Sequence, residues 1–244
     1  IFLILIIAIL YLSVFGIKTD KFNNLINHNV LKLNKKINLR LNDVKYLLNP
    51  FKFTVNVKTK DPQISLEGRN LGIEDIQTSV ALKSLFINQF SIDYLQFKTK
   101  EIKLKDIIAL SRIFQNSPQL FILNSVIKDG FITANVSLNF DEKGKVKENY
   151  KIEGFVKEVK LNILTQIKIK NLDFNFDISE NIYKLKKIDM TLNDIKINSQ
   201  LIEIKEKKNS FFVNGKFFND KRNFDIKKLK AFFTNSPNNI DIKT

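Results

Sequence analysis

The feature that most constrains this chain is an alternation of apolar and polar residues with a period of two. Between Ile132 and Phe140 every second residue is apolar, and the residues between them are Thr, Asn and Ser. The same pattern runs from Leu172 to Ile178. Because successive side chains of a strand point to opposite faces, each segment has one apolar and one polar face. The pattern predicts antiparallel strands with one face in solvent.

Weaker copies of this pattern cover much of the remaining chain, at 51–58, 92–94 and 188–192. A change of parity at Ile195 and Ile197 predicts a β-bulge. Gly154, inside a strand pattern, predicts a bulge or a close backbone approach. Helical spacing appears at 22–33 and 107–114, and Pro118 is expected in a loop. The predicted fold class is all-β, with roughly a dozen strands in an elongated antiparallel sheet and one or two short helices.

Two architectures can bury a single apolar face. A closed barrel or a sandwich hides that face inside, whereas a long sheet that curls lengthwise leaves it lining a groove. The strand sequences alone do not choose between them, and we take the apolar-lined groove as the expectation. The residues expected to line it belong to the clearest alternating segments: Phe53, Val55, Ile92, Val136, Leu138, Phe140, Phe174, Phe176 and Met190.

The first seventeen residues contain no charged side chain, and Lys18 and Lys21 follow them. About 20 apolar residues span a bilayer, with a range of roughly 17 to 25. The run is at the lower limit and the chain begins without Met, so we expect a transmembrane anchor at 1–17 that starts further upstream. The alternative is a cleavable signal peptide. Either assignment places 18–244 outside the cytoplasm as a β-domain, which we expect to be a fragment of a longer one.

The sequence offers no recognisable catalytic machinery. The chain has no Cys and one His, His28, which excludes disulfides and thiolate sites. It has no phosphate-binding loop, no Gly-x-Ser-x-Gly and no carboxylate cluster with metal-ligand spacing. Asp173 and Asp177 share one strand face, where a weak calcium site is one alternative and solvation is the simpler role. We therefore predict a protein that is not an enzyme, with no catalytic residue, metal or cofactor.

The formal net charge is +15, and the lysines stand singly between apolar residues, as in 167–170. On strands this spacing places them on the solvated face, where they discourage edge pairing and attract anionic lipid. Nucleic-acid binding favours a concentrated basic stripe with exposed aromatics. Here the aromatics share the apolar parity, so we expect no nucleic-acid partner.

One stretch resembles the AsmA-like family of bacterial envelope proteins, which is grouped with the repeating β-groove lipid-bridge superfamily. The residues that carry the resemblance are Gly130–Ile132, Leu138–Gly144, Tyr150–Val156, the strand 172–178 and the hairpin 185–197. The resemblance implies a single-pass inner-membrane anchor and a periplasmic β-groove. It also implies a role in outer-membrane biogenesis or phospholipid movement, with phospholipid, membrane and envelope proteins as partners. The alternative is an envelope assembly scaffold that carries no lipid and recruits proteins through its sheet edges.

Overall fold

The computed structural model describes residues 2–21, 23–33, 37–66, 68–82, 92–114, 117–141, 145–163, 167–207 and 210–219. The helices are α1 (Phe2–Val14), α2 (Asn23–Leu33), α4 (Leu104–Phe114) and α5 (Pro118–Val126). The strands of the first half are β1 (Ile17–Lys18), β2 (Ile37–Arg40), β3 (Lys45–Asn49), β4 (Thr54–Lys60), β5 (Gln63–Leu66), β6 (Arg69–Ala81), β7 (Ile92–Thr99) and β8 (Ile102–Lys103). Those of the second half are β9 (Ile127–Asn139), β10 (Lys151–Ile163), β11 (Ile167–Ser179), β12 (Ile182–Leu192), β13 (Ile195–Lys207) and β14 (Ser210–Gly215).

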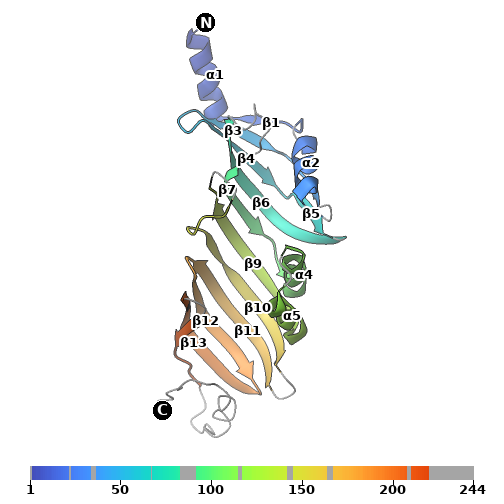
Figure 1. The fold of residues 1–244 in the computed structure, drawn as a ribbon, viewed down its shortest axis with the longest axis vertical. Coiled ribbons are helices and arrows are strands. Elements are labelled where there is room, and N and C mark those ends of the chain that lie inside the picture. Colours follow the sequence, from blue (N-terminus) through green and yellow to red (C-terminus); the bar gives the residue numbers. More distant parts are fainter. Residues whose placement is uncertain are drawn as a thin grey trace.

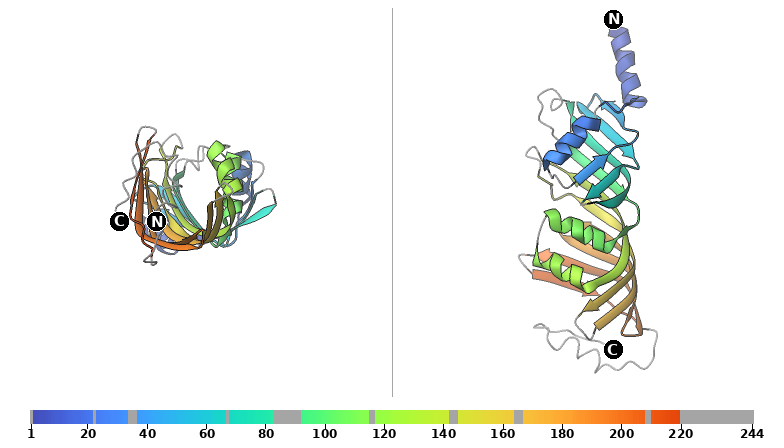
Figure 2. Two further views of the ribbon diagram at one scale, coloured as in Figure 1. Left: turned by 90° about the horizontal axis from the view of Figure 1, so that it is seen from below. Right: turned by 90° about the vertical axis from the view of Figure 1, so that its right-hand side faces the viewer.

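The strands form one antiparallel sheet of fourteen strands, which confirms the mostly antiparallel β prediction. Its main path runs β1-β3-β4-β6-β7-β9-β10-β11-β12-β13-β14, and within the described residues the path does not close on itself. The strands follow one another along the long axis of the molecule (Figure 1). Seen along that axis, the sheet is curled into a U (Figure 2, left). This is one open, curled sheet, and it favours the lengthwise curl over the sandwich.

Two-residue loops connect the long strands β11, β12 and β13 of the second half. Glu180 and Asn181 join β11 to β12, and Asn193 and Asp194 join β12 to β13, all four with positive φ. Two-residue loops with positive φ at both positions match the right-handed twist of the strands they connect. The change of parity that was predicted to be a bulge at Ile195 is therefore this turn, and that prediction is wrong. Leu192 pairs directly with Ile195, on the same face.

Helices α2, α4 and α5 lie along one side of the U, whereas α1 projects beyond the end of the sheet (Figures 1 and 2). The helices predicted at 22–33 and 107–114 are present as α2 and α4. The sequence pattern does not predict helix α5, because it places Pro118 in a loop. Pro118 instead begins the helix, where its missing N–H costs no hydrogen bond, and the Ser117 hydroxyl accepts a hydrogen bond from the Leu120 N–H at 3.4 Å.

Candidate functional site

The candidate site is the apolar face of the curled sheet. Residues that pair directly across two strands point to the same face, so the register shows how far this face extends. One row of direct partners crosses nine strands from β4 to β14: Thr59, Ile76, Phe97, Val136, Ile152, Ile178, Tyr183, Ile204 and Val213. Beside it runs a second row from β9 to β14: Ala134, Gly154, Phe176, Leu185, Ile202 and Gly215. These two rows give the sheet one unbroken apolar face.

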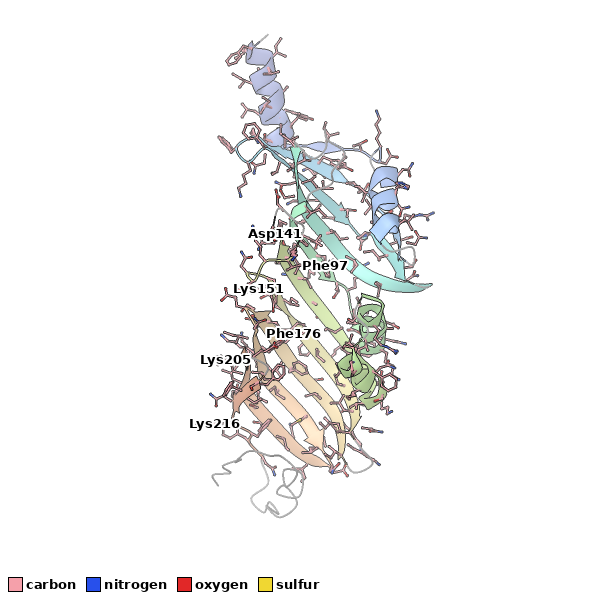
Figure 3. The ribbon with its side chains drawn as sticks, in the orientation of Figure 1. Phe97, Asp141, Lys151, Phe176, Lys205 and Lys216 are labelled. Atoms are coloured by element: carbon pink, nitrogen blue, oxygen red, sulfur yellow. The ribbon has the colours of Figure 1, made fainter. Side chains whose placement is uncertain are left out.

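The opposite, polar face is equally continuous. Its row of direct partners over the same nine strands is Lys60, Asp75, Lys98, Asn135, Glu153, Asp177, Lys184, Glu203 and Asn214. In Figure 3 Phe176 lies over the middle of the sheet, whereas Lys151 and Lys205 lie along its margin. Four charged residues of this row form ion pairs with neighbours outside it: Lys98 with Glu74, Glu153 with Lys151, Asp177 with Lys186 and Glu203 with Lys205.

These ion pairs shift the pKa of exposed groups. A hydrogen bond from Lys205, at 2.7 Å, lowers the pKa of the Glu203 carboxyl. The hydrogen bond to Glu153, at 2.6 Å, raises the pKa of Lys151. On the apolar face, burial raises the pKa of the Tyr183 phenol because the ionised form loses hydration. The two faces therefore differ in solvation as well as in residue type.

Three bulges keep the apolar face continuous near one end of the strands. Glu158, Asn171 and Lys187 each have a φ between 50° and 56°, and register shifts accompany them. Each inserts one residue and so moves the next apolar side chain back to the apolar face. Val159 consequently packs beside Val156 and Phe176. The signal in the sequence was the change of parity between Val156 and Val159, which the alternation argument passed over.

Helix α4 covers part of this face. Leu104 packs against the cluster of Val156, Val159 and Phe176, while Ile107 packs against a second cluster that contains Leu71 and Ile102. These contacts place α4, which lies at one side of the U, against the apolar face (Figure 2). The contact leaves much of the face without a protein partner among the described residues. Phe97, Ile152 and Leu185, for example, are only half-buried.

Most of the residues predicted to line a groove share the apolar face. Val55, Leu138, Phe174 and Met190 pair with Val80, Leu95, Val156 and Ile197 respectively. Val136 and Phe176 belong to the two rows of direct partners and are nearly buried, with exposed fractions of 9% and 8%. Phe140 follows β9 and forms an isolated bridge with Val146.

Phe53 was predicted to line the groove, but it does not belong to the apolar face. Asn49 pairs with Thr54, so the four residues between them form the loop of the β3–β4 hairpin. Phe53 has a φ of 51° and an exposed fraction of 73%, and the Lys52 N–H donates to the Asn49 side chain at 3.1 Å. A positive φ takes a non-glycine residue out of the extended conformation, so Phe53 stands outside the alternation that begins with β4.

Ile92 is on the apolar face, and a register shift that the alternation did not predict separates it from Tyr94. It pairs with Val80 after a register shift, whereas Tyr94 pairs with Ser79. The Tyr94 hydroxyl donates to Gln96, whose amide donates to Asn135, so Tyr94 lies on the polar face. The prediction that Ile92 and Tyr94 share a face is wrong because the shift separates them.

Among the described residues, no three His, Asp or Glu side chains are grouped closely enough to hold a metal ion. Asp173 instead accepts a hydrogen bond from the backbone N–H of Glu158 at 2.6 Å, and Asp177 lies 3.3 Å from Lys186 Nζ. None of the helices formed by the described residues has the length and apolar character needed to cross a membrane.

Comparison with known proteins adds no further assignment. No family model, curated protein or solved structure matches the chain. The resemblance to the AsmA-like family therefore stays a prediction, and the geometry of the sheet is the basis on which a function can be proposed.

Proposed function

We propose that the apolar face binds phospholipid acyl chains and conducts them along the curled sheet. The observation that carries this proposal is the row of direct partners over nine strands, apolar from Ile76 to Val213, which lies opposite a row of polar and charged residues. Large contiguous apolar surfaces on a folded protein are typical of binding sites. Eleven strands at a spacing of about 4.8 Å give a path of about 50 Å, which is longer than one acyl chain.

The energetics suit transport without catalysis. Each CH₂ moved from water onto an apolar surface gains about 0.8 kcal/mol, so a chain of ordinary length is held along the face. Head groups stay in solvent along the open side of the U. Neighbouring rows offer similar aliphatic side chains, so no single position holds a chain much more tightly than the next. In this proposal the protein is an inner-membrane-anchored periplasmic protein of outer-membrane biogenesis, and no residue takes part in a reaction.

The test is the lipid content of the purified protein. We expect the detergent-extracted full chain to retain phospholipid, which mass spectrometry of its organic extract detects. The molar ratio of lipid to protein should stay constant across the gel-filtration peak. An unrelated single-pass membrane protein, taken from the same cells through the same detergent steps, sets the background. Lipid at that background level would contradict transport.

The alternative function is the scaffold that recruits envelope proteins through its edge. The observation that favours it is β14, the last strand of the path, where Phe211 and Val213 are exposed by 64% and 67%. A lipid-free protein that co-purifies with an envelope protein, and loses it when Phe211 and Val213 are changed to Ser, would support this alternative.

The proposed anchor is α1 with the residues that follow it. Every residue of α1 from Phe2 to Val14 is apolar except Tyr11 and Ser13, and its large side chains are mostly exposed, as Leu3 is by 70%. We expect the full chain to stay in the membrane fraction after a carbonate wash, with the part from Lys18 onward cut by protease added from the periplasmic side. Recovery of a cleaved soluble form would contradict the anchor and support the signal peptide.

A further inference from the structure

A second apolar surface lies where α1 meets the sheet, outside the apolar face. Here a cleft of about 520 Å³ opens between the helix and the β3–β4 hairpin. Apolar side chains form most of its lining, among them Ile6, Ile9, Leu10, Leu47 and Phe51, and Lys58 also contributes to it. Phe51 is 95% exposed, so it extends the apolar lining beyond the cleft.

The backbone holds α1 close to β3 at this point. Gly16 has a φ of 66° and its N–H donates to the Tyr11 carbonyl oxygen at 3.3 Å, which ends the helix. A Cβ at Gly16 would meet the Leu47 side chain at 3.1 Å and would collide with the Tyr46 carbonyl oxygen. The chain therefore passes directly against β3 where α1 ends, and the cleft lies between the helix and the hairpin.

A row of three lysines extends across the sheet from Lys58, which lines this cleft. Lys18 of β1 pairs directly with Lys45 of β3, which pairs directly with Lys58 of β4. Direct cross-strand partners have Cβ atoms about 5 Å apart, and like charges at that distance repel. Among the described residues none of the three forms an ion pair, whereas the next row of the polar face places Asp75 between Lys60 and Lys98. The positive charge of the three lysines is therefore uncompensated at this end of the sheet.

We infer that the cleft and the lysine row together bind one anionic phospholipid, with its acyl chains against α1, Leu47 and Phe51 and its phosphate among Lys18, Lys45 and Lys58. An apolar cleft bordered by cations matches the two ends of such a lipid. This inference rests on the proposed location of α1 in the membrane, but not on transport along the apolar face. The bound lipid would hold the first strands of the sheet against the bilayer surface.

The test uses the absence of Trp from the chain. Phe51→Trp places a single fluorophore at the cleft of the full chain, which is reconstituted in phosphatidylcholine vesicles that carry a small fraction of acyl-brominated lipid. We expect brominated phosphatidylglycerol to quench this Trp at a mole fraction about tenfold lower than brominated phosphatidylcholine, since each lysine adds attraction for an anionic head group. Inorganic phosphate added to the buffer should compete weakly, because it lacks the acyl chains.

The triple variant K18Q/K45Q/K58Q should lose this preference. The control K103Q/K147Q/K168Q removes the same charge from three exposed lysines elsewhere, and it should keep the preference. K18R/K45R/K58R should also keep it. Equal quenching by both lipids in the parent protein, or no change in the first triple variant, would overturn the inference. Far-UV circular dichroism of each variant checks that the sheet is intact.

A second reporter separates this inference from the proposed function. Phe97→Trp lies on the apolar face, away from the cleft (Figure 3). If brominated lipid quenches the Trp at position 97 and K18Q/K45Q/K58Q does not change this quenching, the result supports transport along the apolar face independently of the cleft. If phosphatidylglycerol is preferred at position 51 but neither lipid quenches the Trp at position 97, the result supports the cleft site and contradicts transport. No quenching at position 51 by either lipid overturns the cleft site together with the membrane location of α1.

Discussion

Leu138→Asp and Ile178→Asp are expected to abolish phospholipid co-purification while leaving the sheet folded. Both residues are on the apolar face, where they pair with Leu95 and Ile152, and both are only half-buried by the protein. A carboxylate there lies in the path of the acyl chains, and losing about 2 kcal/mol of lipid binding reduces retained lipid by more than tenfold. The partial exposure of the two positions limits the cost to folding to about 1–2 kcal/mol, a fall in Tm of about 3–6 °C.

The matched controls are one residue away on the other face. Ser137→Asp and Ser179→Asp add the same charge to the polar face, where both pair with Lys151, and should leave lipid content and Tm nearly unchanged. Phe176 and Val136 are poorer choices because the protein already covers them almost fully. Retention of lipid by both apolar-face variants would contradict transport along this face. Loss of the β-type circular dichroism in both would mean that the face is a packed core.

Gly154→Val should strongly destabilise the protein. A Cβ at Gly154 would lie 2.7 Å from Phe176 Cζ and 3.0 Å from Ala134 Cα, and it would also overlap the carbonyl oxygen of Thr133. Two of these three neighbours are backbone atoms, so repacking of side chains does not relieve the overlap. We expect a loss of about 3 kcal/mol in the free energy of unfolding, and a fall in Tm of about 6–12 °C in thermal denaturation.

Two comparisons isolate the cause. Gly72→Ala changes another strand glycine, where the nearest atom to the new Cβ would be Lys100 Cβ at 3.1 Å with no overlap of backbone atoms, and it should cost less than about 1 kcal/mol. Gly154→Ala combined with Phe176→Leu should recover only part of the stability lost by Gly154→Ala, because the backbone overlap remains. Equal effects of Gly154→Ala and Gly72→Ala would show that the close approach at Gly154 is not the cause.

Gly154 also shows what a residue type can indicate before a structure is known. A glycine inside a strand pattern predicted a bulge or a close approach, and the structure shows the close approach: the Phe176 ring lies against it. The bulges are at Glu158, Asn171 and Lys187, where no glycine signals them. A bulge depends on two paired strands, so one strand sequence shows only the resulting change of parity.

Local sequence pattern was sufficient to predict the fold class and the division of side chains between two faces. Period-two alternation is a local property, and it placed Val136, Leu138, Phe174 and Phe176 on one face before any partner strand was known. Tertiary structure decided where alternation ends and which strands pair. The β3–β4 hairpin removed Phe53 from the apolar face, and a register shift separated Ile92 from Tyr94. The lysine row was also a tertiary result, because Lys18, Lys45 and Lys58 are distant in sequence and become neighbours only through strand pairing.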